Sequence, residues 1–123
     1  MKSHRNVSVK KVSEATDIQR CLAIRYQVFV EGQNVPIDQE SDGLDSSSEH
    51  YLLFVNQLPV GTARVRYIDD FAKIERVSVL ETYQGQRLGH VLMHFIIEDM
   101  QRNHQVKKAK LGAQSYAIPF YEN

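Results

Sequence analysis

The chain has 123 residues, which suits one compact domain over residues 1–123 and leaves little room for a second. Hydrophobic residues make up 42% and charged residues 24%, which is ordinary for a soluble globular protein. The 15 basic and 15 acidic side chains cancel, so the net charge gives no reason to expect binding to nucleic acid or to an anionic membrane.

The cysteine content and the N-terminus favour a cytoplasmic protein. Cys21 is the only cysteine, so no intrachain disulfide can form, which fits a reducing compartment. The charged start Met1–Arg5 is not followed by the apolar segment of a signal peptide, and no apolar run is long enough to cross a membrane. We therefore expect cytoplasmic localisation without membrane contact.

The first part of the chain is predicted to hold a strand, a helix and a loop. Val7–Val12 is a plausible strand, and the helix after it has Ser13 or Thr16 as a candidate cap. Cys21 lies on the apolar face of this helix, so we expect a buried core thiol rather than a nucleophile. Glu31–Ser48 is rich in turn-forming residues and should be mostly loop.

Three neighbouring strands are predicted in the middle of the chain, at His50–Val55, Thr62–Ile68 and Ala72–Leu80. Each is rich in branched and aromatic residues, and the middle one alternates between apolar and polar positions. Short turns at Asn56–Pro59 and Asp69–Asp70 separate them, which predicts an antiparallel meander.

Leu88–Met100 is the clearest helix, because its apolar side chains form one stripe. A short strand is expected at Lys108–Ala113, and a last helix from about Ser115 to the end of the chain. This order of elements predicts a mixed α/β fold with a largely antiparallel central sheet flanked by helices.

A turn with two glycines, Gln84–Gly89, leads into this helix. The first amides of a helix lack intrahelical partners, and its dipole favours negative charge there, so the turn could bind an anion. Gly85 and Gly89 would let a ligand approach the backbone. The glycine spacing excludes a P-loop and a three-glycine dinucleotide fingerprint. By pattern alone, a simple turn and an anion site are equally good interpretations.

Together with Val77–Leu80, this turn resembles the acetyl-CoA motif of the GNAT superfamily of N-acetyltransferases. That motif runs Gln or Arg, two residues, Gly, one residue, then Gly or Ala. Gln84 and Gly89 match its ends, whereas Arg87 stands where the inner glycine is usual. Further matches, to the ElaA-like bacterial branch, follow in order along the chain: Arg25–Gln33, Asp42–Gly43, His50, Gly61–Arg64, Leu111–Gln114 and Phe120–Glu122.

The resemblance implies the GNAT acyl-CoA N-acyltransferase fold, acetyl-CoA as cosubstrate, no metal, and an amine acceptor of unknown identity. Backbone groups around Val77–Val79 should pair with the pantetheine arm, and the amides of Gln86–His90 should hold the pyrophosphate. Arg87 either contacts a phosphate or faces solvent. The implied cofactor-binding residues are Val77, Ser78, Val79, Gln84, Gly85, Gln86, Arg87, Leu88, Gly89 and His90.

Acetylation of an amine requires its neutral form, and a lysine-like amine with a pKa of about 10.4 is mostly protonated at neutral pH. A general base would therefore help, and the departing thiolate needs a proton. The resemblance implies Tyr121 as the acid, although this aromatic ring could simply pack.

Two residues are candidates for the base. In simple alternation Glu75 shares a strand face with Val77 and Val79, but it could equally be a salt-bridged carboxylate. His50 could help to bind or deprotonate the acceptor, or could be a structural hydrogen-bond partner.

Two further groups of polar residues allow both a functional and a structural interpretation. Asp42 and Asp45 could recognise a cationic amine, or could simply be solvated. His90, His94 and Glu98 stack on one helix face, which resembles a metal site, but the ordinary polar face of an amphipathic helix explains them better. We therefore expect no metal.

The end of the chain adds an expectation about assembly. Relatives continue with two more strands, so the resemblance implies a shortened domain whose last two strands are missing. The edge of the Lys108–Ala113 strand would then be unpaired, which predicts a homodimer or a larger assembly. The leading function is acetyl transfer to a primary amine of a small molecule or a protein. The alternative is a CoA-binding or interaction module with little or no turnover.

Overall fold

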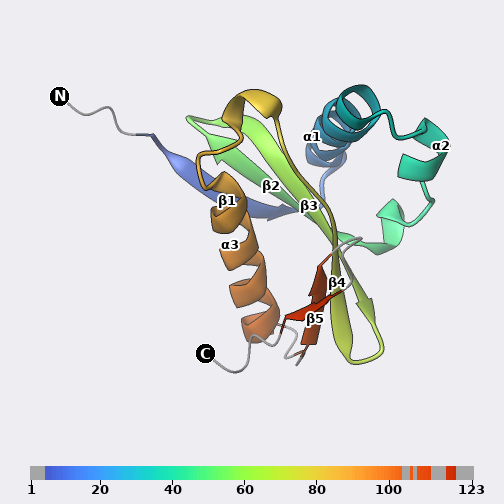
Figure 1. Cartoon of the computed structure of the whole chain (residues 1–123). Helices are drawn as coiled ribbons and strands as arrows, with labels where there is room; N and C mark the ends of the chain where they lie inside the picture. Colours follow the sequence, from blue (N-terminus) through green and yellow to red (C-terminus); the bar gives the residue numbers. More distant parts are fainter. Residues whose placement is uncertain (1–4, 104–105, 107, 112–115, 119–123) are drawn as a thin grey trace.

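The computed structural model of the protein describes residues 5–103, 106, 108–111 and 116–118 (Figure 1). The strands are β1 (Val7–Val12), β2 (Glu49–Val55), β3 (Leu58–Ile68), β4 (Phe71–Val79), β5 (Lys108–Leu111) and β6 (Tyr116–Ile118). The helices are α1 (Ala15–Arg25), its π-helical continuation η1 (Tyr26–Glu31), α2 (Ile37–Glu40) and α3 (Leu88–Asn103), with short 3-10 turns η2 (Asp45–Ser47) and η3 (Glu81–Tyr83). None of the described helices is long and apolar enough to span a bilayer.

The strands form one sheet in the order β1-β2-β3-β4-β5-β6. Every neighbouring pair is antiparallel except β4 and β5, which are parallel because α3 carries the chain back across the sheet between them. The predicted mixed α/β fold with a largely antiparallel sheet is therefore confirmed.

The helix expected from Ser115 is wrong, because residues 116–118 form β6. This strand pairs with β5, with Ala109 opposite Ile118 and Leu111 opposite Tyr116. Pairing satisfies backbone groups along the outer edge of β5, a long-range effect that local helix periodicity does not contain.

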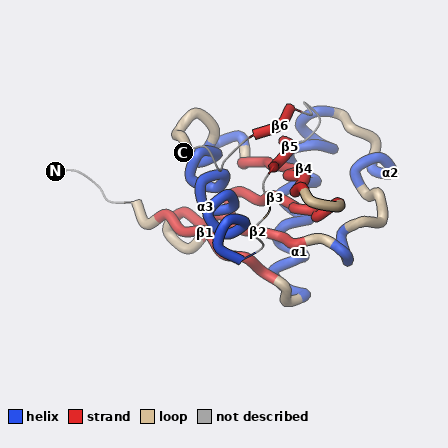
Figure 2. Tube along the Cα trace, turned by 90° about the horizontal axis from the view of Figure 1, so that it is seen from below, coloured by secondary structure: helices blue, strands red, loops and turns tan. Residues whose placement is uncertain are grey.

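Helices α1 and α3 cover opposite faces of the sheet (Figures 1 and 2). Leu52 of β2 packs with Cys21 and Ile24 of α1, whereas its neighbour Leu53 packs in the cluster that contains Leu92 of α3. Successive strand residues point to opposite faces, so this alternation fixes the two layers. Cys21 is fully buried, as expected.

Local details at three element boundaries differ from expectation. Glu14 precedes α1 without a side-chain cap, so neither Ser13 nor Thr16 caps the helix. The segment expected to be mostly loop contains the short helix α2 and the turn η2. Strand β3 already begins at Leu58, because the turn from β2 needs only Asn56 and Gln57, both of which adopt positive φ.

A β-bulge interrupts β4 at Arg76. Thr62 and Arg64 of β3 pair with Ser78 and Glu75 of β4, so Ala63 alone faces two β4 residues. Arg76 has a φ of 56°, in the left-handed region. The extra residue shifts the alternation, so Glu75 lies on the same face as Ser78 and not on that of Val77 and Val79. The expected sharing of a face by Glu75, Val77 and Val79 is wrong for this reason.

Strands β4 and β5 run together over only part of their length. The parallel pairing joins Phe71–Ile74 to Lys108–Leu111. Beyond Ile74, β4 continues to Val79 with no β5 partner among the residues that the structure describes. The second half of β4 therefore presents an edge to which a strand-like ligand could pair.

Candidate active site

The turn between β4 and α3 has the geometry of an anion site. Gly85 and Arg87 have φ values of 79° and 64°, and α3 starts immediately afterwards at Leu88. The first helical hydrogen bond recorded at this end runs from Val91 N to Arg87 O at 3.3 Å. The amides that precede Val91 are therefore directed out of the helix start, where the dipole also favours negative charge.

A cavity of about 410 Å³ lies at this turn. A Cβ added to Gly85 or Gly89 would meet no heavy atom within 4 Å, so the backbone faces open space there. The described lining residues are Val79, Tyr83, Gln84, Gly85, Arg87, Leu88, Gly89 and His90. Seven of the ten expected cofactor-binding residues are thus brought together, and the open glycine backbone fits a diphosphate.

The other three expected residues, Val77, Ser78 and Gln86, lie beside the cavity without being among its lining. Val77 packs against the core on the α3 side. Ser78 is buried, and its hydroxyl donates to the carbonyl oxygen of Arg76 at 3.2 Å. The side-chain oxygen of Gln86 accepts a hydrogen bond from the guanidinium of Arg5, which brings the start of the chain to the turn.

Gln84 ties the turn to the end of β4. Its side-chain nitrogen donates to the carbonyl oxygen of Val79 at 2.8 Å. The residue that begins the glycine turn therefore holds the last residue of the strand, and this bond fixes how β4 leads into α3.

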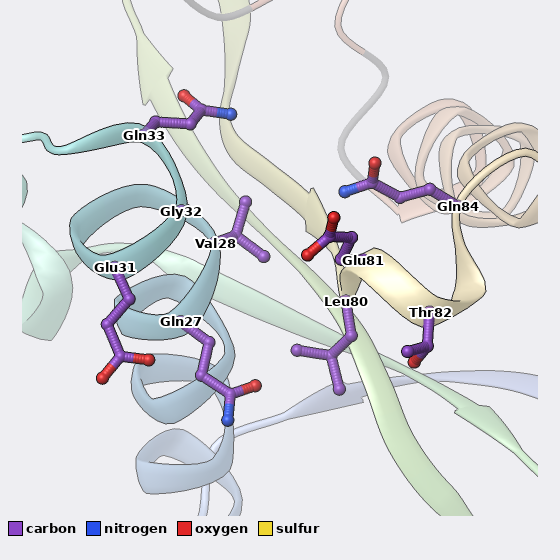
Figure 3. Close-up of a pocket in the computed structure, with 9 residues that line it drawn as sticks. All are labelled: Gln27, Val28, Glu31, Gly32, Gln33, Leu80, Glu81, Thr82 and Gln84. Atoms are coloured by element: carbon purple, nitrogen blue, oxygen red, sulfur yellow. The ribbon is translucent and has the colours of Figure 1, made fainter.

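A second cavity, of about 520 Å³, lies on the other side of Gln84 (Figure 3). One wall comes from η1 and the two residues that follow it, and the other from the segment 80–84. Gln84 lines both cavities, so they are neighbours. The described lining residues are Gln27, Val28, Glu31, Gly32, Gln33, Leu80, Glu81, Thr82 and Gln84.

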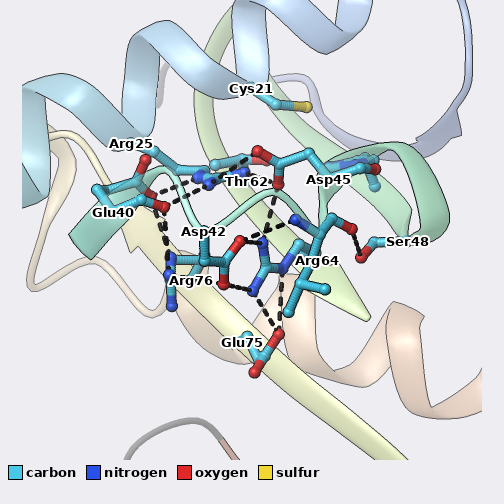
Figure 4. Close-up of polar contacts among 12 residues, drawn as sticks. Cys21, Arg25, Glu40, Asp42, Asp45, Ser48, Thr62, Arg64, Glu75 and Arg76 are labelled. Atoms are coloured by element: carbon cyan, nitrogen blue, oxygen red, sulfur yellow. Dashed lines mark hydrogen bonds and ion pairs between the residues drawn. The ribbon is translucent and has the colours of Figure 1, made fainter. Parts of the chain in front are cut away.

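Buried arginines bind the acidic segment Glu40–Asp45 to the sheet and to the end of α1 (Figure 4). Arg64 is fully buried and donates to Glu75 at 2.7 Å, Asp42 at 2.8 Å and Asp45 at 3.0 Å. Arg25, also fully buried, donates to Glu40 and Asp45, both at 2.7 Å. We call Arg25, Glu40, Asp42, Asp45, Arg64, Glu75 and Arg76 the arginine–carboxylate network.

Within this network the arginines lower the pKa values of both aspartates. The hydrogen bonds from Arg64 lower the pKa of Asp42 far below its usual range. Burial alone would raise the pKa of Asp45, but Arg25 and Arg64 outweigh it and lower that pKa. Both aspartates therefore neutralise buried arginines, so they are neither simply solvated nor free to receive a cationic amine.

Glu75 is also engaged by arginines. Besides Arg64, its carboxylate accepts two hydrogen bonds from Arg66, at 2.8 and 2.9 Å. Burial would raise the pKa of Glu75, but these two guanidinium groups lower it to about 2. A carboxylate stabilised in this way is a weak proton acceptor at neutral pH, and the salt-bridge interpretation accounts for its surroundings.

His50 lies next to the network and is 3% exposed. Its Nε2 is 2.8 Å from the carbonyl oxygen of Asp45. A carbonyl only accepts, so Nε2 carries a hydrogen and, in neutral imidazole, Nδ1 keeps its lone pair. Among the described residues, His50 Nδ1 is the one buried side-chain nitrogen or oxygen without a hydrogen-bond partner.

Tyr121 and the helix face with His94 and Glu98 are the remaining candidates. Tyr121 lies outside the described residues. His94 Nε2 is 3.2 Å from Glu98, and both side chains are largely exposed. Within the described ranges, no group of three or more metal-ligating side chains occurs.

Sequence reasoning allowed for a salt-bridged Glu75, but it missed the rest of the arginine–carboxylate network and the second cavity. The alternation of Arg64 and Arg66 along one strand face, opposite an acidic loop, was a usable signal for ion pairs. The second cavity had no such signal, because η1 and the 80–84 segment are about fifty residues apart and meet only in the fold.

The chain resembles known acetyltransferases in sequence and in fold. Residues 17–123 match the profile described as "Acetyltransferase (GNAT) family". The uncharacterised N-acetyltransferase YjcF of Bacillus subtilis is 35% identical, over 80% of this chain and 70% of that protein. ElaA of Escherichia coli is 34% identical, over 83% of this chain and 69% of that protein.

Solved structures agree with these sequence matches. The crystal structure of Escherichia coli ElaA superposes with a TM-score of 0.74 and 26% identity, over 86% of this chain and 77% of that one. A GNAT acetyltransferase from Elizabethkingia anophelis, crystallised with acetyl-CoA bound, superposes with a TM-score of 0.68 and 21% identity, over 86% of this chain and 64% of that one.

Proposed function

We propose that this chain, which belongs to the GNAT family of acetyltransferases, moves an acetyl group from acetyl-CoA to a primary amine of a small molecule or a protein. Family membership makes the chain an acetyltransferase, whereas the amine acceptor is our inference. The observation that carries the proposal is the open glycine turn at the start of α3, next to the end of β4. That end of β4 has no β5 partner among the described residues. The family match favours an enzyme over a CoA-binding module without turnover.

The turn and the strand suit the two halves of CoA. The exposed amides of Gln86–His90 would hold the pyrophosphate, supported by the helix dipole. The free edge of β4 around Val77–Val79 would pair with the amides of the pantetheine arm, as another strand would. Arg87 is among the residues that line the cavity, and its guanidinium would add positive charge beside the phosphates.

For the proton transfers we propose His50 and Tyr121. Nδ1 of His50 has a lone pair without a partner among the described residues, which suits a proton acceptor that reaches the amine through water. Its burial limits direct contact with the acceptor. Tyr121 is proposed as the donor to the departing sulfur, on the family resemblance alone. Glu75 is a weaker candidate base, because Arg64 and Arg66 already bind its carboxylate.

Two further expectations stay proposals. Cytoplasmic localisation rests on the single cysteine. The expectation of a homodimer rests on an unpaired edge of β5. Because β6 pairs with that edge, this reason for dimerisation is weaker. Light scattering at micromolar concentration distinguishes a dimer from a monomer.

The proposed function is tested by calorimetry with CoA and by thiol release from acetyl-CoA over a panel of amines. We expect saturable CoA binding and turnover with at least one primary amine. Tyr121→Phe should lower kcat by roughly 10²–10⁴-fold if the hydroxyl is the general acid. CoA binding without turnover on any amine would leave the binding module as the better description, and no binding would exclude both.

A further inference from the structure

The β-bulge at Arg76 lies where β4 leaves its neighbour β5. Before the bulge, Phe71–Ile74 pairs with β5, whereas no described residue of β5 pairs with Val77–Val79 after it. A bulge bends its strand and increases the local twist. The bulge therefore sets the direction of the free edge to which the pantetheine arm is proposed to pair.

Arg76 is an unusual residue for this backbone position. Its φ of 56° lies in the left-handed region, and a bulge with a left-handed residue usually has glycine there, because glycine has no Cβ. A residue with a side chain keeps such a conformation only where its surroundings hold it, and conformations of this kind gather at ligand sites. An arginine at this position therefore indicates that its side chain has a role.

The Arg76 side chain joins the bulge to the end of α2 (Figure 4). Its Nε lies 3.1 Å from Glu40 Oε2, and its Nη2 lies 3.2 Å from Asp42 Oδ2. The same Nη2 donates to the carbonyl oxygens of Gln39, at 3.3 Å, and of Glu40, at 3.2 Å. Arg25, which is fully buried, also binds the Glu40 carboxylate, at 2.7 Å. The group that holds Arg76 is thus itself fixed to α1.

The far end of the free half of β4 is held by other bonds. The amide of Leu80 donates to the carbonyl oxygen of Val60 at 2.9 Å. The side chain of Gln84 donates to the carbonyl oxygen of Val79 at 2.8 Å. Both bonds lie at the end that leads into the glycine turn. At the opposite end, the guanidinium of Arg76 fixes the strand.

We propose that Arg76 is a positioning residue for CoA. Its guanidinium, bound by Glu40 and Asp42, holds the bulge and so orients the free edge of β4 for the pantetheine arm. The proposal rests on the function proposed above. Arg76 is not among the described lining residues of the cofactor cavity, so it acts through the backbone of β4 and not by contact with the phosphates. Its removal should weaken binding of the arm and leave the turn at residues 84–90 intact.

The test compares two ligands that differ by the pantetheine arm. CoA uses both the turn and the strand of the proposed site, whereas 3′-phosphoadenosine 5′-diphosphate keeps the diphosphate and lacks the arm. In calorimetry, Arg76→Ala should lower CoA affinity by roughly tenfold, because a misdirected edge loses main-chain hydrogen bonds to the arm. The affinity for the shorter ligand should stay unchanged, which also shows that the variant is folded at the turn.

Two further variants separate the side chain from the backbone strain. Arg76→Gly adopts the left-handed φ easily but has no guanidinium, so it should bind CoA as weakly as Arg76→Ala. Arg66→Ala is the matched control, because the side chains of Arg66 and Arg76 are 22% and 23% exposed. Arg66 also binds a carboxylate of the network, Glu75, but it lies on β3 and outside the bulge. Its loss should leave both affinities unchanged.

The ratio of the two affinities decides the outcome. Equal losses for both ligands in Arg76→Ala would make Arg76 a general support of the fold, and this result would overturn the proposal. Full CoA affinity in Arg76→Gly would overturn it as well, because the side chain would then be dispensable. If neither ligand binds the unaltered protein, the proposed function itself fails and this inference falls with it.

Discussion

Arg87 has a backbone conformation that residues with side chains rarely adopt. Its φ of 64° lies in the left-handed region, which costs an L-residue about 1–2 kcal/mol. The acetyl-CoA motif usually has glycine at this position, and the positive φ gives the physical reason for that glycine. An arginine at this position adds backbone strain, but it also adds a positive charge to the lining of the cofactor cavity.

Replacing Arg87 separates strain from charge. Arg87→Gly should relieve the left-handed backbone and raise the free energy of unfolding by up to about 1 kcal/mol, a gain limited by glycine's freedom in the unfolded chain. Arg87→Ala keeps the strain and should not be stabilised. If the guanidinium contacts phosphate, both variants should lose roughly tenfold in CoA affinity. Urea denaturation and calorimetry measure the two effects, and unchanged CoA affinity in both variants would place Arg87 in solvent.

The arginine–carboxylate network makes stability depend on pH. The pKa of Glu75 falls from 4.5 to about 2 on folding, so its contribution is fully present above pH 4.5 and is lost as the pH falls towards 2. Asp42 and Asp45 also have lowered pKa values and add to the same loss. We expect the urea midpoint of the protein to fall steeply between pH 5 and about pH 2.

Glu75→Gln should lower the free energy of unfolding at pH 7 by about 3 kcal/mol, because it removes one charge from a buried, hydrogen-bonded group. It should also flatten the pH dependence below pH 5, since one titrating carboxylate is gone. Glu98→Gln breaks only an exposed pair with His94 and should change stability by less than about 0.5 kcal/mol. An equal effect of the two substitutions would show that the network adds no stability.

At the scale of elements, the identities of the strands and longer helices up to β5 followed from sequence periodicity. Strand β6 and the turns and bulges that join the elements did not. The meander and α3 were predicted because alternation and the helical stripe are local patterns. The bulge at Arg76 was not, since it depends on how Ala63 faces two residues of a neighbouring strand. That single residue decides that Glu75 points into the arginine–carboxylate network. The role of Glu75 therefore depended on backbone geometry that periodicity cannot supply.

Two glycines on neighbouring elements should respond to alanine in opposite ways. A Cβ on Gly61 of β3 would lie 2.9 Å from Leu53 Cδ2 and 3.2 Å from the carbonyl oxygen of Ser78. Gly61→Ala should therefore lower the free energy of unfolding by about 1–3 kcal/mol through overpacking.

Gly89→Ala meets nothing within 4 Å and should leave stability unchanged or slightly raised, since alanine favours the helix. Its methyl group would enter the cofactor cavity, so CoA affinity should fall. Thermal denaturation and calorimetry measure both quantities. If Gly89→Ala lowers the free energy of unfolding but leaves CoA affinity unchanged, the glycine is required for packing and not for CoA binding.

At the scale of the whole molecule, the candidate cofactor site was predictable and the second cavity was not. Residues 84–90 are contiguous, so a motif could name most of the cavity that they form. The second cavity combines η1 with the segment after β4, which only the fold brings together. A site formed by one contiguous turn can be identified from the sequence. A site formed between elements far apart in the sequence can be identified only from the structure.

CoA binding should stabilise the folded chain as a whole, because the turn and the free edge of β4 exist only in the folded state. A ligand at a hundred times its Kd adds about 2.7 kcal/mol to the free energy of unfolding, which should raise the Tm by several degrees. Hydrogen exchange should slow at the amides of Gln86–His90, where the pyrophosphate is proposed to bind, and along Val77–Val79, where the pantetheine arm is proposed to pair. Protection at the turn without protection of β4 would retain the anion site and exclude the strand-like path of the pantetheine arm.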